Sequence, residues 1–372
     1  MGGRYEYQKT LELIHKRLLA NGKKYDSVSP SASAVDGVYS ISMGIDWTDS
    51  FYVGMLWLDW MRTKDNAIKA NIDLQMGEFA QRLKQTRGLD NHDIGFLYIL
   101  SAVAGFKLTG CETYRDMAVR AAHLLSSRYH PSAKFIQAWG NPNGKENYRL
   151  IIDCMLNIPL LYWAAKETGD RALYDIAYDH ARTTMQTIFR LDYSTYHTFY
   201  FDYDSGKPLC GKTKQGAGDD TAWARGQAWA VYGFVLSYRY TGDEEFLSAA
   251  RHAADYFLAH LPADRVCYWD LCFSDGDSEP RDTSAAAIAA CGMLEIDKLA
   301  GEGTYYRERA EEIVQSLCEN YVSSEGKESL LDHAVYSIPD HVGIDEACIW
   351  GDYYFMEALS SLADEQSFVS FW

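Results

Sequence analysis

A repeat of paired helices constrains the fold of this chain more than any other sequence feature. Four dipeptides mark the repeat: Thr109-Gly110, Thr168-Gly169, Thr241-Gly242 and Ala300-Gly301. Each follows a helical stretch that is apolar on nearly all sides, and each precedes an aromatic residue and an amphipathic helix. Glycine directly after a helix is the usual stop signal. A helix that is apolar all round must be buried, so the repeat predicts inner helices that alternate with amphipathic outer ones.

The number of these helices predicts a closed ring. We expect inner helices over residues 51–62, 94–108, 151–167, 225–240, 284–299 and 348–362. Five amphipathic helices follow the first five of these, and residues 6–21 supply a sixth. The prediction is therefore an all-α fold, an (α/α)6 barrel of six inner and six outer helices, with short β pieces only at 197–203 and 265–272. No Pro-rich or Ser-rich linker interrupts the chain, so residues 1–372 are expected to form a single domain.

Charge and composition exclude several classes of partner. A formal net charge of −17 argues against nucleic acid and anionic membrane surfaces. No apolar run reaches the roughly 18 residues that suggest a membrane span, and the N-terminus lacks the apolar core of a signal peptide. The eight cysteines form no Cys-x-x-Cys pair, so we expect reduced thiols in a cytoplasmic protein. Ten Trp and 27 Tyr are many for a chain of this length, and carbohydrate-active proteins often show such an excess.

Residues 223–234 combine side chains that suit neither a core nor a solvent face. Trp223 and Gln227 are four residues apart, as are Arg225 and Trp229, so each pair shares one face of a helix. Indole faces cover the apolar side of a pyranose, and a guanidinium binds a carboxylate through two parallel hydrogen bonds. The segment therefore indicates a pocket for an anionic sugar. The alternative is a buried arginine that packs against tryptophan and binds a neighbouring carbonyl.

Other unusual side chains lie near the N-terminal ends of the expected inner helices. In such a barrel these helices run roughly parallel, so these ends share one rim. Helix N-termini carry partial positive charge, which favours an anionic ligand. The rim residues are Trp47, Asn91, His92, Asp93, Trp139, Asn147, Asp153, His197, Gln215, Asp219, Asp220, Asp282, Ser284, Cys348 and Trp350.

Asp153 is the residue most at odds with its neighbours. We expect it in the first turn of an inner helix whose other residues are almost all apolar. Burial there should raise its pKa, and a carboxylic acid that stays protonated near neutral pH is what general acid catalysis requires. Asp93 is its natural partner. The structural alternatives are a helix cap for either residue and an ion pair between Asp153 and Arg149.

We expect no metal and no cofactor. His92 stands beside Asp93, but no His-x-x-x-His pair or facial set of carboxylates lies near it in the sequence. Asp219 and Asp220 lack the spacing of an EF-hand loop, and the chain has neither a glycine-rich phosphate loop nor a Gly-x-Ser-x-Gly motif. Three further histidines are interpreted as structural or surface residues: His180, His252 and His333.

In combination, these residues resemble the unsaturated glucuronyl hydrolases, glycoside hydrolase family 88. The resemblance covers nearly the whole chain and is carried by residues 91–96, 223–229, 282–287 and 348–353 together with Asp153. It implies a substrate with a 4,5-unsaturated uronic acid at its non-reducing end, as polysaccharide lyases leave on glycosaminoglycans. It also implies that Asp153 is the general acid/base and Asp93 a second essential carboxylate. The residues that it places around the sugar are Trp47, His92, Trp139, His197, Gln215, Trp223, Arg225 and Trp229.

Some members of this family bind a sulfate with Ser and Lys in the loop before the last inner helix. Here Ser337 is present, but residues 333–347 contain no Lys or Arg and include Asp340, Asp345 and Glu346. Because like charges disfavour an anionic group, we expect a preference for substrates that are unsulfated on the second sugar.

Three other functions remain open from the sequence. The related unsaturated rhamnogalacturonyl hydrolases would use the same barrel and chemistry on pectin fragments. A sugar epimerase would need paired acid/base groups, for which only His92 and His197 are candidates. A non-catalytic carbohydrate-binding barrel would not need Asp153 in an apolar helix. The sequence carries no indication of an oligomeric state.

Overall fold

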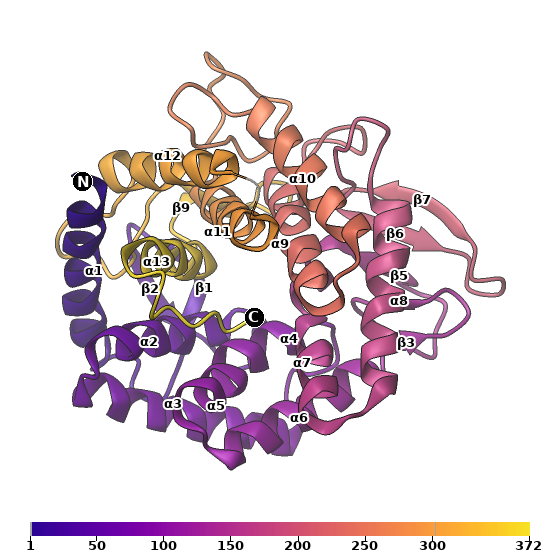
Figure 1. Cartoon of the computed structure of the whole chain (residues 1–372), viewed down its shortest axis with the longest axis horizontal. Coiled ribbons are helices and arrows are strands. Elements are labelled where there is room, and N and C mark those ends of the chain that lie inside the picture. Colours follow the sequence, from indigo (N-terminus) through magenta and orange to yellow (C-terminus); the bar gives the residue numbers. More distant parts are fainter. Residues whose placement is uncertain (1, 302) are drawn as a thin grey trace.

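The helices form a double ring around a common axis (Figure 1). The computed structural model describes residues 2–301 and 303–372. Its inner ring consists of α2 (Asp49–Thr63), α4 and α5 (Ile94–Tyr98 and Ala104–Thr109), α7 (Pro159–Thr168), α9 (Ala224–Thr241), α11 (Thr283–Ala300) and α13 (Ile349–Ala363). Its outer ring consists of α1 (Gly2–Asn21), α3 (Asn66–Gln85), α6 (Glu112–Ser126), α8 (Arg171–Ile188), α10 (Glu244–Ala259) and α12 (Tyr305–Asn320). The predicted (α/α)6 barrel is therefore confirmed, whereas a single domain over residues 1–372 stays a prediction.

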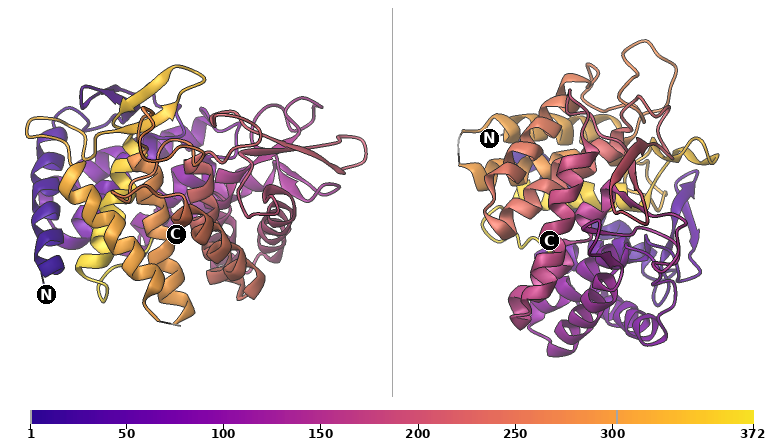
Figure 2. Two further views of the ribbon diagram at one scale, coloured as in Figure 1. Left: turned by 90° about the horizontal axis from the view of Figure 1, so that it is seen from above. Right: turned by 90° about the vertical axis from the view of Figure 1, so that its right-hand side faces the viewer.

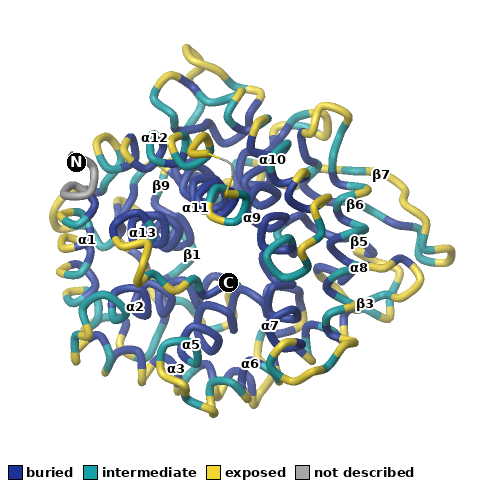
Figure 3. Tube along the Cα trace, viewed as in Figure 1, coloured by how far each residue is buried: buried dark blue, intermediate teal, exposed yellow. Residues whose placement is uncertain are grey.

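Burial follows the sequence pattern that predicted the two rings (Figure 3). In α9 every residue from Ala224 to Ser237 is buried, whereas α8 buries one face only, including Leu173, Ala177 and Ala181. The four repeat glycines end α5, α7, α9 and α11 in the left-handed conformation, with φ values of 70°, 76°, 69° and 62°. The stop signals therefore do what the repeat predicted.

Two inner helices are interrupted where the sequence predicted continuous ones. Between α4 and α5 the chain makes a π-helical segment, Ile99–Val103. The third inner segment begins with a strand and a 3₁₀ turn (Ile152–Leu156), and the α-helix starts only at Pro159. Proline has no N–H to donate and suits the first helical position, so the α-helix begins there and not at residue 151.

Short antiparallel hairpins gather at one end of the barrel (Figure 2). They are β1 (Pro30–Val35) with β2 (Val38–Ile41), β3 (Tyr129–His130) with β4 (Phe135–Ile136), β5 (Arg149–Ile151) with β6 (Thr198–Phe201) and β7 (Pro208–Lys212), and β8 (Ala334–Ser337) with β9 (Val342–Glu346). The β piece expected at 197–203 is confirmed by β6. The strand expected at 265–272 is wrong, because that segment pairs with its neighbours only through isolated bridges at Tyr268 and Asp270.

Aromatic rings fill the barrel axis. The Phe96 ring lies 5.5 Å from Trp47 and from Trp229, and 6.2 Å from Trp372. The Trp372 ring stacks on Tyr354 at 6.0 Å, and the C-terminus of the chain lies near the centre of the ring of helices in Figure 1. The interior is therefore a packed core and not a channel. Among the described helices, none has a stretch apolar and long enough to cross a membrane.

Gly95 permits the closest approach between two inner segments. A Cβ atom at this position would lie 2.3 Å from the Asn157 backbone, so only glycine lets α4 pack against the 3₁₀ turn. We predict that Gly95→Ala lowers the free energy of unfolding by about 1–3 kcal/mol through overpacking. The matched control is Gly77→Ala in α3, where a Cβ meets nothing within 4 Å. In the control, the free energy of unfolding should rise by about 0.5–1 kcal/mol. Equal stability of the two variants in urea denaturation would contradict the prediction.

Candidate active site

A cavity of about 740 Å³ opens at the hairpin end of the barrel. Its wall contains all but one of the predicted site residues: Trp47, Asp93, Trp139, Asp153, His197, Gln215, Trp223, Arg225 and Trp229. The exception is His92, which is fully buried behind the wall. His92 therefore does not line the cavity directly, and its predicted place at the sugar site stays a prediction.

Asp93 and Asp153 come from neighbouring inner segments. Asp93 stands at the N-cap of α4 without a capping hydrogen bond from its side chain, and its N–H donates to Asn91 Oδ1 at 2.9 Å. Asp153 lies in the 3₁₀ turn after β5, not in the first turn of an α-helix as predicted. His92 Nε2 lies 3.4 Å from Asp93 Oδ1 and 3.3 Å from Asp153 Oδ1. The tertiary fold thus joins the three groups.

Burial shifts the ionisation of all three groups toward their neutral forms. It raises the pKa of Asp153 to about 7, against the opposing charges of Arg225 and Arg149. Burial and the charge of Asp153 raise the pKa of Asp93 well above its usual range. Burial also lowers the pKa of His92 well below its usual range, so the ring is neutral. Two carboxyl groups held this close retain at least one proton near neutral pH.

The structural alternatives for Asp153 are not seen. The Asp153 side chain is 21% exposed, toward the cavity, so it is open to a ligand. Arg149 lies outside ion-pair distance of it and donates from Nη1 to the Tyr200 hydroxyl at 2.7 Å. Asp153 therefore remains free to exchange a proton with a molecule in the cavity.

Aromatic side chains form opposite parts of the cavity wall. Trp47 donates from Nε1 to the Tyr336 hydroxyl at 3.0 Å and packs 5.2 Å from Trp350. The Trp223 ring lies 4.3 Å from His197. Trp139 projects further into solvent and is 40% exposed. Flat apolar faces with hydrogen-bonding edges suit the two sides of a sugar ring.

Arg225 is bound mainly by the protein. Its Nη1 donates to Asp282 Oδ2 at 3.3 Å and to the Val335 carbonyl, and its Nη2 donates to the Tyr336 carbonyl at 2.7 Å and to Gln215 Oε1 at 3.2 Å. The guanidinium also lies 4.4 Å from the Trp223 ring. This geometry matches the buried-arginine alternative, and a free fork for a substrate carboxylate is not present. Arg225 still brings positive charge to the wall and orders Gln215 beside it.

Several cavity residues were not identified as sugar-site residues from the sequence. They are Ile45, Asp46, Gly88, Asp90, Arg149, Ile151, Lys214, Tyr336 and Asp340. Most come from the hairpins and loops, whose place over the rim no periodic pattern reveals. Arg149 had a signal in its spacing of four residues from Asp153, but that spacing suggested an ion pair and not a shared wall.

His92, Asp93 and Asp153 are also close enough to suggest a cation site, since one ligand atom from each lies within 4.8 Å of the others. Sequence spacing did not foresee this group. A histidine that binds a metal usually donates its second ring nitrogen to a carboxylate or carbonyl, yet His92 Nδ1 has no hydrogen-bond partner. His92 Nε2, Asp93 Oδ1 and Asp153 Oδ1 have no hydrogen-bond partner either, and the absence of a metal stays a prediction.

The other histidines differ in their settings. His180 is buried and accepts from the Ile136 N–H at 2.9 Å, whereas His333 is exposed and lies 2.8 Å from Asp345. His252 stacks on Tyr193 at 4.0 Å. None of the three lines the cavity, which agrees with the structural or surface roles predicted for them.

Comparison with known proteins gives consistent matches along the chain. The family model described as Glycosyl Hydrolase Family 88 matches residues 16–365. An unsaturated chondroitin disaccharide hydrolase of Streptococcus pneumoniae is 41% identical over 95% of this chain and 91% of its own length. An unsaturated glucuronyl hydrolase of Bacillus sp. (strain GL1) is 40% identical over 95% of each chain.

Solved structures agree with these matches. The crystal structure of an unsaturated glucuronyl hydrolase from Streptococcus agalactiae has a TM-score of 0.96 and 38% identity, and the match covers 99% of this chain and 94% of that one. A mutant of that enzyme, in a complex with dGlcA-GalNAc6S, has a TM-score of 0.88 and 35% identity, with the same coverage.

The raised pKa of Asp153 predicts how the free energy of unfolding changes with pH, whatever the function of the protein. A carboxyl group whose pKa rises from 3.8 to about 7 on folding stabilises the protein at low pH, and this contribution is lost as pH rises through about 7. Asn cannot ionise, so Asp153→Asn should gain stability relative to the wild-type protein between pH 4 and pH 8. Urea denaturation across that range measures the difference, and a difference that does not change with pH would count against the shift.

Proposed function

The chain belongs to glycosyl hydrolase family 88, and from this membership we propose that it removes a 4,5-unsaturated uronic acid from the non-reducing end of glycosaminoglycan-type oligosaccharides. The observation that carries the proposal is the setting of Asp153. Its carboxyl group, with a pKa of about 7, opens into a cavity walled by tryptophans. A proton donor near neutral pH and flat apolar walls are what this reaction needs.

The chemistry begins at the double bond and not at the anomeric carbon. A 4,5-unsaturated uronide is a vinyl ether, so its π electrons can take the Asp153 proton at C4 and leave an oxocarbenium-like centre at C5. Water then adds at C5 and returns a proton to the Asp153 carboxylate. The resulting hemiketal opens, and the glycosidic bond is lost as a consequence. Because attack is not at C1, the separation of the two carboxyls does not report retention or inversion.

Asp93 and His92 would support Asp153 in different ways. Asp93 is almost fully buried and its pKa is raised well above the usual range, so it would act in the neutral form and hold the geometry of the site. His92 is neutral and contacts both carboxyls, so it fixes their separation without adding charge. The positive charge of Arg225 lowers the pKa of Asp153 and so offsets part of the rise that burial causes.

The geometry is less favourable to the alternative functions. An epimerase would need two acid/base groups that are open to the substrate. His92 is fully buried, and His197 Nδ1 accepts a hydrogen bond from the backbone N–H of Lys214 at 3.0 Å. Burial also lowers the pKa of His197 to about 3. A non-catalytic barrel would not need a buried pair of carboxyl groups. Rhamnogalacturonyl hydrolysis shares the chemistry, but the named relatives act on chondroitin disaccharides or carry the glucuronyl name.

We also propose a cytoplasmic location. The surface cysteines Cys210 and Cys272 are free, which fits a reducing compartment. Such an enzyme would receive small unsaturated saccharides that a polysaccharide lyase has already produced.

The role of Asp153 is tested by Asp153→Asn, which keeps the shape of the side chain and removes the proton. We expect a loss in kcat of about 100-fold or more. Turnover is followed by the ultraviolet band of the conjugated double bond, which hydration destroys. In the wild-type protein kcat should fall as pH rises through about 7, since the acid is then deprotonated. Retention of more than about a tenth of the wild-type kcat in the variant would exclude Asp153 as the acid.

A second prediction concerns sulfate on the second sugar. Asp340 lines the cavity and accepts from the Ser337 hydroxyl at 2.7 Å, so a carboxylate takes the place of a cation in this loop. We expect a higher kcat/KM for an unsulfated disaccharide than for its sulfated counterpart, and Asp340→Asn should narrow the difference. Lys214 and Arg149 also line the cavity, and their positive charges would favour a sulfated disaccharide. Clearly faster turnover of the sulfated disaccharide would make the prediction wrong.

A further inference from the structure

We propose that Arg82, on the outer helix α3, is a positioning residue that holds one wall of the substrate cavity. The proposal rests on the proposed function for the identity of the substrate, but not for the contacts that define the role. Arg82 is 3% exposed and is not among the residues that line the cavity. Any effect on the site must therefore pass through the groups that it binds.

The Arg82 guanidinium joins two separate loops. Its Nη1 donates to the Asp46 carbonyl at 3.2 Å and to Asp49 Oδ2 at 2.7 Å. Its Nε donates to the Arg87 carbonyl at 3.0 Å, and its Nη2 donates to the Gly88 carbonyl at 3.3 Å. The first two acceptors precede and open α2, and the last two follow α3. One side chain thus fixes the distance between these loops.

Both loops supply the wall of the cavity. Ile45, Asp46 and Trp47 line it from the first loop, and Gly88, Asp90 and Asn91 line it from the second. Trp47 stands two residues before Asp49 and contributes a flat face of the proposed sugar site. Asn91 binds the backbone N–H of Asp93. A shift of either loop would therefore displace a binding surface first and the catalytic pair second.

Arginine is specifically suited to this place. Its planar fork offers five N–H donors in fixed directions, whereas lysine offers a single ammonium group. Asp49 is also buried, at 2% exposure, and depends on Arg82 for its ion pair. Lysine can replace that ion pair but cannot span three carbonyls, so the two substitutions separate charge from geometry.

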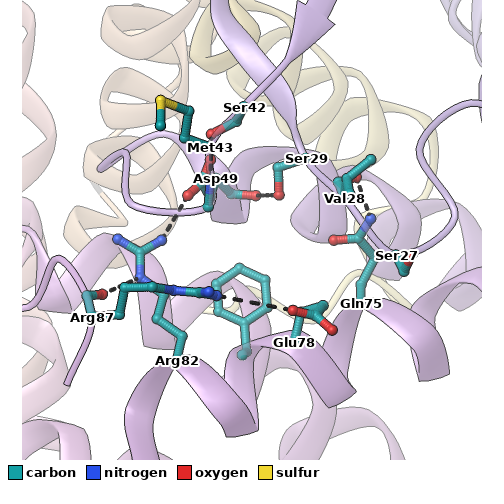
Figure 4. A pocket seen from close by; sticks show the side chains of 12 residues that line it. Ser27, Val28, Ser29, Ser42, Met43, Asp49, Gln75, Glu78, Arg82 and Arg87 are labelled. Atoms are coloured by element: carbon teal, nitrogen blue, oxygen red, sulfur yellow. Dashed lines mark hydrogen bonds and ion pairs between the residues drawn. The ribbon is translucent and has the colours of Figure 1, made fainter. Parts of the chain in front are cut away.

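The Arg82–Asp49 pair borders a smaller pocket of about 230 Å³ (Figure 4). In the close-up, dashed lines join Arg82 to Asp49 and Arg87 to Glu78. Water can enter this pocket, so a shorter side chain at residue 82 need not leave an empty cavity. Arg87 supplies a matched control, since its side chain lies at the same pocket, is 41% exposed and reaches Glu78 only at 3.9 Å.

The first measurement is the kinetics of Arg82→Gln, Arg82→Lys and Arg87→Gln on an unsaturated chondroitin disaccharide. Because a misplacement of about 1 Å can cost roughly 100-fold, we expect Arg82→Gln to raise KM by about tenfold or more. The kcat value should fall less, since Asp153 lies on a different segment. Arg82→Lys should recover part of the loss, and Arg87→Gln should match the wild-type protein. An unchanged KM for Arg82→Gln, or equal effects of the two Gln variants, would overturn the proposal.

The second measurement needs no substrate. Hydrogen exchange in Arg82→Gln should become faster in residues 44–49 and 87–92 and stay unchanged in the distant helices. Uniformly faster exchange would indicate a general loss of stability and overturn a positioning role. If Arg82→Gln does not fold, Arg82→Lys takes its place with the same expected pattern, since lysine keeps the charge but cannot reach all three carbonyls. A wild-type protein that leaves the disaccharide intact would refute the proposed function, while the exchange pattern would still decide the role of Arg82.

Discussion

The structure depends on one constraint, the need to bury inner helices that are apolar on every side. A ring of six such helices inside six amphipathic ones satisfies this need, because each inner helix then touches neighbours, outer helices and the aromatic axis. Phe96, Trp229 and Tyr354 fill that axis, so it has no room for a ligand. Along the axis, space for a ligand is left only at an end, and the short sheets and loops enclose a cavity where the inner helices begin.

The same constraint explains why the carboxyl chemistry is found where the helices are interrupted. A carboxyl group buried inside a continuous inner helix, such as Glu357 of α13, is bound by protein side chains and does not face the cavity. The third inner segment instead reaches the cavity as a strand and a 3₁₀ turn, and Asp153 lies on that turn. Gly95 lets the neighbouring segment approach so closely that His92 contacts both carboxyls. Burial then raises the pKa of Asp153 to about 7.

Two arginines, Arg225 and Arg82, support the cavity in different ways. Arg225 donates to two carbonyls, Gln215 and Asp282, so it organises the wall and adds positive charge to it. Arg82 stands outside the cavity and ties the loops that carry Trp47 and Asn91. In both cases a planar fork binds several backbone acceptors at once.

The sequence by itself determined the architecture and predicted part of the cavity wall. Periodicity, the stop glycines and the odd side chains at helix starts are local signals, and they predicted the barrel, Asp93, Asp153 and the tryptophans of the wall. Tertiary structure alone decided where the inner helices are interrupted, how the short sheets cover the rim, that His92 is buried, and that Arg225 is hydrogen-bonded by the protein. These features depend on contacts between residues far apart in the chain, such as Arg225 with Val335 and Gly95 with Asn157. Local patterns record which face of a helix is apolar, but not which distant group will meet it.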